Sequence, residues 1–187
     1  MIKIYLDQGH NPRDFNTGAE GNGLFEQDIT YDIGVRLYNL MRRNPAFEPR
    51  LSRPDESTVL GTTNSSSLTA RVREANSWGA DIFLSLHTNA AVNSNATGSE
   101  ALIYSTSSTV ANALAEDILT EMTDLTGLRN RGVVERPGLY VLRRTSMPAV
   151  LVEMGFITNP TDAYLMANEP QLFAEGIYRG FLEYYDL

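Results

Sequence analysis

The sequence predicts an α/β fold: a single, mostly parallel, twisted sheet with helices on both of its faces. Short apolar runs alternate along the chain with longer segments of helical periodicity, which is the order of elements in parallel sheets with crossover helices. Two of these runs, in residues 81–87 and 148–153, are mostly apolar, as is typical of strands that are buried on both faces. We find no internal repeat and no linker-like segment, so we expect residues 1–187 to form one domain.

The chain begins with a short apolar strand over residues 2–6, which ends at Asp7. A long loop rich in Gly, Asn and Asp follows, and a loop of this length after a first strand is more often functional than decorative. Residues 24–43 place apolar side chains at helical spacing, which predicts a long amphipathic helix. Residues 47–51 form the second expected strand.

The middle of the chain repeats this alternation. Residues 53–67 are polar and turn-rich, which predicts a flexible surface loop. Ser67 is expected to cap a helix over residues 68–78, and Gly79 to end it. The next strand is expected at residues 81–87. The remaining elements are a strand at 99–105, a helix at 108–125, a strand at 139–143, the strand that begins at Pro148, and helices at 161–167 and 171–185.

The composition excludes several classes of protein. The 187 residues carry a net charge of −8 without a cluster of Lys or Arg, which argues against nucleic acid as the main partner. No run of about 20 apolar residues is present, so we expect no membrane-spanning helix. The opening MIKIYLD is too short, and too soon interrupted by Asp7, to be a signal peptide, so we expect none in this chain. With no cysteine, the chain has no disulfide, no thiolate zinc site and no cysteine nucleophile.

Three polar side chains are expected at one edge of the sheet. His10 follows the first strand, His87 ends the third, and Glu153 ends the strand that begins at Pro148. The carboxyl ends of parallel strands meet where α/β proteins bind ligands. Each residue alone has an ordinary explanation: a histidine in a loop is usually structural, and a strand-end glutamate can turn to solvent. Both histidines and a carboxylate are expected at one edge of the sheet, and together they are stronger evidence for a functional site than any one of them alone.

Glu26 is the fourth candidate, in the first turn of the helix over residues 24–43. Acidic residues favour this position for the helix dipole alone. The functional alternative is that Glu26 joins the histidines as a metal ligand, because two imidazoles and one carboxylate form a ligand set of hydrolytic zinc, with an open position for water. Glu153 then suits the role of general base.

Other chemistries are less well supported. The chain has no G-x-S-x-G elbow, no P-loop and no H-E-x-x-H helix. Gly21 and Gly23 give a G-x-G, but Glu26 stands where a dinucleotide-binding motif needs glycine. A carboxylate pair for glycoside hydrolysis remains open, although no pair is singled out.

Together, these segments resemble the zinc-dependent N-acetylmuramoyl-L-alanine amidases of the Amidase_3 type. The resemblance rests on DQGH at residues 7–10, Glu26 at the start of a helix, ADIFLSLHTNA at 80–90 and PAVLVEMGFITN at 148–159. Residues 71–76, 131–133 and 139–143 also look like family segments, so the resemblance covers essentially the whole chain. Gln8, where the family usually has Pro, and Asn11-Pro12, in place of Gly-Gly, depart from the pattern without removing a ligand.

The resemblance implies a zinc ion held by His10, Glu26 and His87, with Glu153 as the catalytic glutamate. The implied reaction is hydrolysis of the amide between the lactyl group of N-acetylmuramic acid and L-alanine of the stem peptide. This points to an autolysin or endolysin catalytic domain that acts on peptidoglycan at the bacterial cell wall. We expect a monomer that is targeted by a separate wall-binding module, since anionic wall polymers repel a domain of net charge −8. The alternatives are a non-catalytic wall-binding module and a zinc peptidase of the stem peptide.

Overall fold

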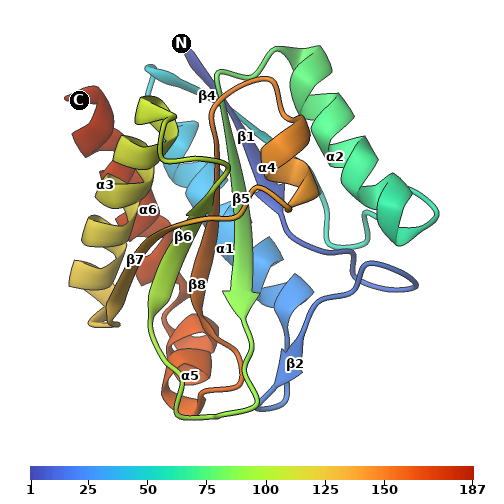
Figure 1. Cartoon of the computed structure of the whole chain (residues 1–187), viewed down its shortest axis with the longest axis vertical. Helices are drawn as coiled ribbons and strands as arrows, with labels where there is room; N and C mark the ends of the chain where they lie inside the picture. Colours follow the sequence, from blue (N-terminus) through green and yellow to red (C-terminus); the bar gives the residue numbers. More distant parts are fainter.

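The computed structural model describes all 187 residues and shows a central sheet between two layers of helices (Figure 1). The strands are β1 (Ile2–Gln8), β2 (Glu20–Gly21), β3 (Leu24–Phe25), β4 (Phe47–Leu51), β5 (Ile82–Asn89), β6 (Ser99–Ile103), β7 (Asn130–Glu135) and β8 (Ala149–Phe156). The helices are α1 (Glu26–Met41), α2 (Asn64–Trp78), α3 (Thr109–Thr126), α4 (Tyr140–Arg144), α5 (Pro160–Asn168) and α6 (Pro170–Tyr185). No helix combines the length and the apolar content needed to cross a lipid bilayer.

The main sheet has six strands in the order β4-β1-β5-β8-β6-β7, and β2 pairs with β3 in a separate hairpin. All pairings in the main sheet are parallel except that of β6 with β8. The prediction of a mostly parallel sheet is therefore confirmed. The carboxyl ends of β1, β5 and β8 lie at one edge, toward the end of the molecule where β2 and α5 are seen (Figure 1).

Alternation along the strands fills two apolar layers. On β1, Ile4 and Leu6 face a core of 28 buried residues that α1, α3 and α6 cover. Tyr5 faces the opposite side, where a core of 10 buried residues includes side chains of α2 and α4. Helices thus cover both faces of the sheet, as predicted, and the face under α2 and α4 has the thinner layer.

Helices α3 and α6 pack at a distance that only glycine permits. A Cβ atom on Gly180 would lie 2.5 Å from Cα of Ile118. We expect Gly180→Ala to lower the free energy of unfolding by about 1–3 kcal/mol, because one helix must move away. Gly138→Ala is the matched control, since no atom lies within 4 Å of its added Cβ. Equal stability of the two variants in urea unfolding would contradict this account of the packing.

The prediction of a strand over residues 139–143 was wrong, because this segment forms helix α4. Val141 and Leu142 are adjacent and both buried, whereas Arg143 and Arg144 are both exposed. A strand would send neighbouring side chains to opposite faces and expose one of the two apolar residues. One helical turn buries both against α2 and β8.

Other boundaries also differ from the prediction. Helix α2 begins at Asn64, because Thr63 and Ser66 form a capping box, so the predicted cap at Ser67 was wrong. Gly79 ends α2 in the left-handed conformation, as predicted. The edge strand β7 and the β2–β3 hairpin were not predicted, since neither contains an apolar run.

Candidate metal centre

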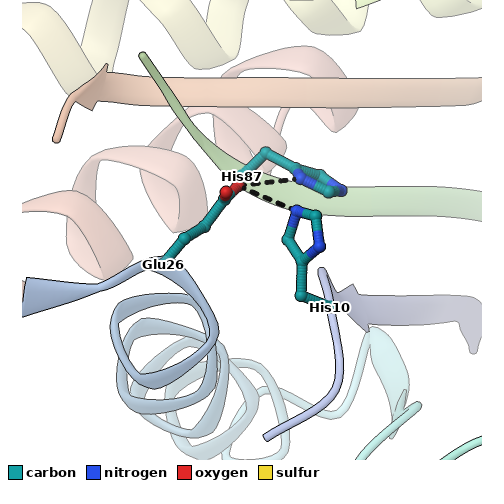
Figure 2. Close-up of side chains that lie close together, drawn as sticks. All are labelled: His10, Glu26 and His87. Carbon is teal, nitrogen blue, oxygen red and sulfur yellow. Dashed lines mark hydrogen bonds and ion pairs between the residues drawn. The ribbon is translucent and has the colours of Figure 1, made fainter. Parts of the chain in front are cut away.

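Three predicted residues from distant parts of the chain converge at the carboxyl edge of the sheet. His10 lies two residues after β1, Glu26 is the first residue of α1, and His87 lies in β5. Oε1 of Glu26 is 3.2 Å from Nε2 of His10 and 3.0 Å from Nδ1 of His87 (Figure 2). The three ligand atoms all lie within 4.8 Å of one another.

The distances from Glu26 to the two histidines fit a tetrahedral metal ion. Ligand atoms at about 2.0–2.1 Å from zinc lie about 3.3 Å apart in a tetrahedral site, close to the two distances above. Nδ1 of His10 is 3.2 Å from the carbonyl oxygen of Asn16. A carbonyl can only accept, so this bond places the proton on Nδ1 and directs the lone pair of Nε2 toward Glu26. Two acceptors that face each other at this distance need a shared proton or a cation between them.

The backbone of the His10 loop is held by a buried arginine. His10 has a φ of 69°, in the left-handed region that is uncommon for a residue other than glycine. The guanidinium of Arg71 donates to the carbonyl oxygens of Gln8 at 2.7 Å and His10 at 2.6 Å. Arg71 also pairs with Asp7 at 2.5 Å, and both side chains are almost fully buried. This ion pair therefore fixes the position from which the His10 side chain projects.

The two departures from the usual family pattern lie on either side of the Gly9-His10 pair, with Gln8 at the end of β1 and Asn11 in the loop that follows. Oε1 of Gln8 accepts from the backbone N–H of Arg53 at 2.8 Å. Asn11 donates to the carbonyl oxygen of Leu60 at 3.1 Å and accepts from its N–H at 3.1 Å. Both side chains are fully buried, and they attach the His10 loop to the segment that precedes α2.

Glu26 is fixed by backbone donors on both sides. Its Oε2 accepts from the N–H of Ala19 at 2.8 Å, and its Oε1 accepts from the N–H of Thr88 at 2.9 Å. Burial opposes ionisation of this carboxyl, but the adjacent imidazoles of His10 and His87 outweigh burial and hold its pKa well below the ordinary range. Glu26 thus presents a negative charge to the two imidazoles.

Glu153 lies beside this centre, but not at the end of its strand as predicted, because β8 continues to Phe156. It is in register with His87 on β5, so both side chains project from the same face of the sheet. Its Oε2 is buried and has no hydrogen-bond partner. Burial, followed by the charges of Glu26 and Glu100, raises its pKa to about 8.

The raised pKa of Glu153 predicts a pH-dependent stability of the metal-free protein. Between the ordinary value of 4.5 and about 8, the folded protein holds a proton that the unfolded chain releases. The contribution of the neutral carboxyl to stability is therefore complete below pH 4.5 and is lost as the pH rises through about 8. We expect thermal unfolding in chelator to show Tm of the wild type falling relative to Glu153→Gln across this window. If the Tm of the two proteins changed in parallel with pH, the raised pKa of Glu153 would be contradicted.

A small apolar cavity adjoins the centre on the side of α2 and α4. Its volume is about 110 Å³, and it reaches both His10 and His87. Its apolar wall comes from α2, the α4 segment and β8: Leu68, Leu139, Tyr140, Val141 and Leu151. Neither this cavity nor the supporting roles of Arg71 and Asn16 were predicted, since buried and exposed polar residues look alike in a sequence.

Comparison with known proteins agrees with this architecture. The model of the family described as N-acetylmuramoyl-L-alanine amidase, Amidase_3, matches residues 4–183. Over 181 residues, the chain is 37% identical to the N-acetylmuramoyl-L-alanine amidase CwlM of Bacillus licheniformis, covering 96% of this chain and 66% of that protein. Over 186 residues, it is 38% identical to the amidase LytC of Bacillus subtilis (strain 168), covering 97% of this chain and 35% of that protein.

A solved structure shares the whole fold. The crystal structure of the N-acetylmuramoyl-L-alanine amidase from Clostridium difficile 630 superposes with a TM-score of 0.87 at 32% identity, covering 99% of this chain and 97% of that one. The match of the family model extends over nearly all of the chain, including the three converging residues and Glu153. The chain therefore belongs to the Amidase_3 family of N-acetylmuramoyl-L-alanine amidases.

Proposed function

We propose that this chain is a zinc-dependent peptidoglycan amidase that hydrolyses the amide between the lactyl group of N-acetylmuramic acid and L-alanine of the stem peptide. The observation that carries the proposal is the convergence of His10, Glu26 and His87 beside the unpartnered carboxylate of Glu153. Membership of the Amidase_3 family supports the choice of substrate.

The zinc ion would be held by Nε2 of His10, Oε1 of Glu26 and Nδ1 of His87. When bound, zinc would act as a Lewis acid that lowers the pKa of a water molecule and polarises the amide carbonyl. The N–H groups of Ala19 and Thr88 orient Glu26, and the bond to Asn16 fixes the tautomer of His10. These contacts orient the side chains of Glu26 and His10 in the metal-free protein.

Glu153 is the proposed general base. Its free Oε2 accepts a proton from the attacking water and passes it to the nitrogen of the breaking amide bond. The buried position suits both steps, because a carboxyl whose pKa lies near the working pH can accept and release a proton. The register of Glu153 with His87 supports this role, because adjacent strands lie about 5 Å apart and His87 is a proposed metal ligand.

The products released from purified sacculi test this proposal. Amidase activity releases peptides with a new N-terminal L-alanine and leaves an intact lactyl carboxylate on the glycan. A stem-peptide peptidase leaves L-alanine attached to muramic acid, and a binding module releases nothing. Mass spectrometry of the soluble products separates the three, and either of the last two results would overturn the proposal.

We also propose that residues 1–187 form a single catalytic unit, a monomer acting at the bacterial cell wall. The chain spans 66% and 35% of the length of the two curated relatives described above. A separate wall-binding module, as in a longer autolysin or endolysin, would offset the repulsion between anionic wall polymers and a net charge of −8. Full lytic activity of these residues alone on intact cells would count against such a module.

A further inference from the structure

Glu100 is a second carboxylate beside Glu153, and the steps above do not use it. On β6, Glu100 is in register with Glu153 on β8, and Glu153 is in register with His87 on β5. Residues in register on adjacent strands project from the same face of a sheet. His87, Glu153 and Glu100 therefore form one row across three strands, with the general base in the middle.

The carboxylate of Glu100 is held in place by donors from two other segments. Its Oε1 accepts from Nδ2 of Asn89 at 2.9 Å, and its Oε2 lies 3.5 Å from Nε of Arg131. Arg131 is itself held over the ring of Phe156, 5.1 Å from its centroid. The side chain of Glu100 is 14% exposed, so it is oriented by the protein and still reachable by a ligand.

The order of His87, Glu153 and Glu100 indicates where the carbonyl side and the nitrogen side of the scissile amide would bind. Hydrolysis forms a C–O bond and breaks the C–N bond, giving a carboxylate and an ammonium, and both protons of the water end on the nitrogen. In the proposed function, the carbonyl and the water would lie at the metal centre, on the His87 side of the base. The nitrogen must lie within reach of Glu153 to receive its proton, and the strand next to Glu153 on the side away from His87 is β6.

We propose that Glu100 binds the leaving amino group, accepting a hydrogen bond from the amide N–H and then pairing with the L-alanyl ammonium as it forms. This inference rests on the proposed amidase function. A carboxylate pairs more strongly with an ammonium than with a neutral N–H, so the contact strengthens as the C–N bond breaks. Interactions that strengthen along the reaction raise kcat rather than only lowering KM.

Paired amide and ester substrates test this role. The substrates are a muramoyl-L-alanyl peptide and its analogue with an ester in place of the scissile amide, whose leaving alcohol stays neutral. We expect Glu100→Gln to lower kcat for the amide by about 10- to 100-fold, the range of one charged hydrogen bond, and to change the ester rate by less than about threefold. Glu100→Asp, which keeps the charge, is expected to recover part of the amide rate.

The controls separate this role from a structural one. Glu135→Gln changes an exposed glutamate on β7 and is expected to leave both rates unchanged. Equal losses on amide and ester, or an unchanged amide rate in Glu100→Gln, would overturn the inference.

Product binding is a second readout that needs no turnover. By calorimetry, L-Ala-γ-D-Glu-L-Lys is expected to bind Glu100→Gln about 10-fold more weakly than wild type, whereas the peptide acetylated at the α-amino group of L-Ala, which keeps only the side-chain ammonium of L-Lys, binds the two equally. Equal binding of the free peptide would overturn the role of Glu100. Wild type that binds the free peptide in this way but cleaves no muramoyl amide would instead overturn the proposed function.

Discussion

Glu153→Gln is expected to lower the rate of amide hydrolysis by about 10²- to 10⁴-fold, the contribution of a positioned general base. The amide side chain has the same size but cannot accept the proton of the attacking water. Zinc content is expected to stay at one ion per chain, because none of the three proposed ligands changes. The measurement is kcat on a muramoyl peptide, with metal analysis of the same samples.

The matched control for this variant is Glu135→Gln, which removes an exposed carboxylate on the edge strand β7, two strands away from β8. It is expected to keep wild-type activity. A Glu153→Gln protein that retains both zinc and full activity would show that another group takes the proton.

Arg71→Gln is expected to lower the free energy of unfolding by about 3–5 kcal/mol, because it leaves Asp7 as an unpaired buried charge. It also removes both donors to the carbonyl oxygens of Gln8 and His10. The His10 side chain then loses its fixed position, so we expect weaker zinc binding as well. Urea unfolding measures the first effect, and competition with a zinc chelator under folding conditions measures the second.

Arg73→Gln lies two residues away on the same helix, is exposed and provides the control. Its effect on stability is expected to be within about 0.5 kcal/mol. Unchanged chelator competition in a folded Arg71→Gln protein would mean that the ion pair supports the fold but not the metal ligand.

Long elements with a clear period could be predicted from the sequence. The strand that carries His87 and the helix that begins at Glu26 were both placed near their observed positions. The wrong strand at residues 139–143 is only five residues long, and so short an apolar run does not show whether its period is that of a helix or of a strand. Only the packing of Val141 and Leu142 on the layer under α2 decides between them.

The convergence of His10, His87 and Glu153 could be predicted because the carboxyl-terminal parts of parallel strands share an edge of the sheet, although β5 and β8 both continue beyond His87 and Glu153. The buried residues that hold these side chains in place could not be predicted. Arg71 and Arg73 look equivalent in the sequence, yet one is buried against Asp7 and the other is exposed. The place of Glu100 beside Glu153 depends on the antiparallel pairing of β6 with β8, which the alternation of strands and helices does not reveal.

The most direct test of the metal centre is an anomalous difference map at the zinc absorption edge, from crystals of the protein with one equivalent of zinc. The account predicts one strong peak within about 2.0–2.2 Å of Nε2 of His10, Nδ1 of His87 and Oε1 of Glu26, with Glu153 outside the ligand set. A peak at another group of side chains, or a zinc ion bound directly by Glu153, would contradict it.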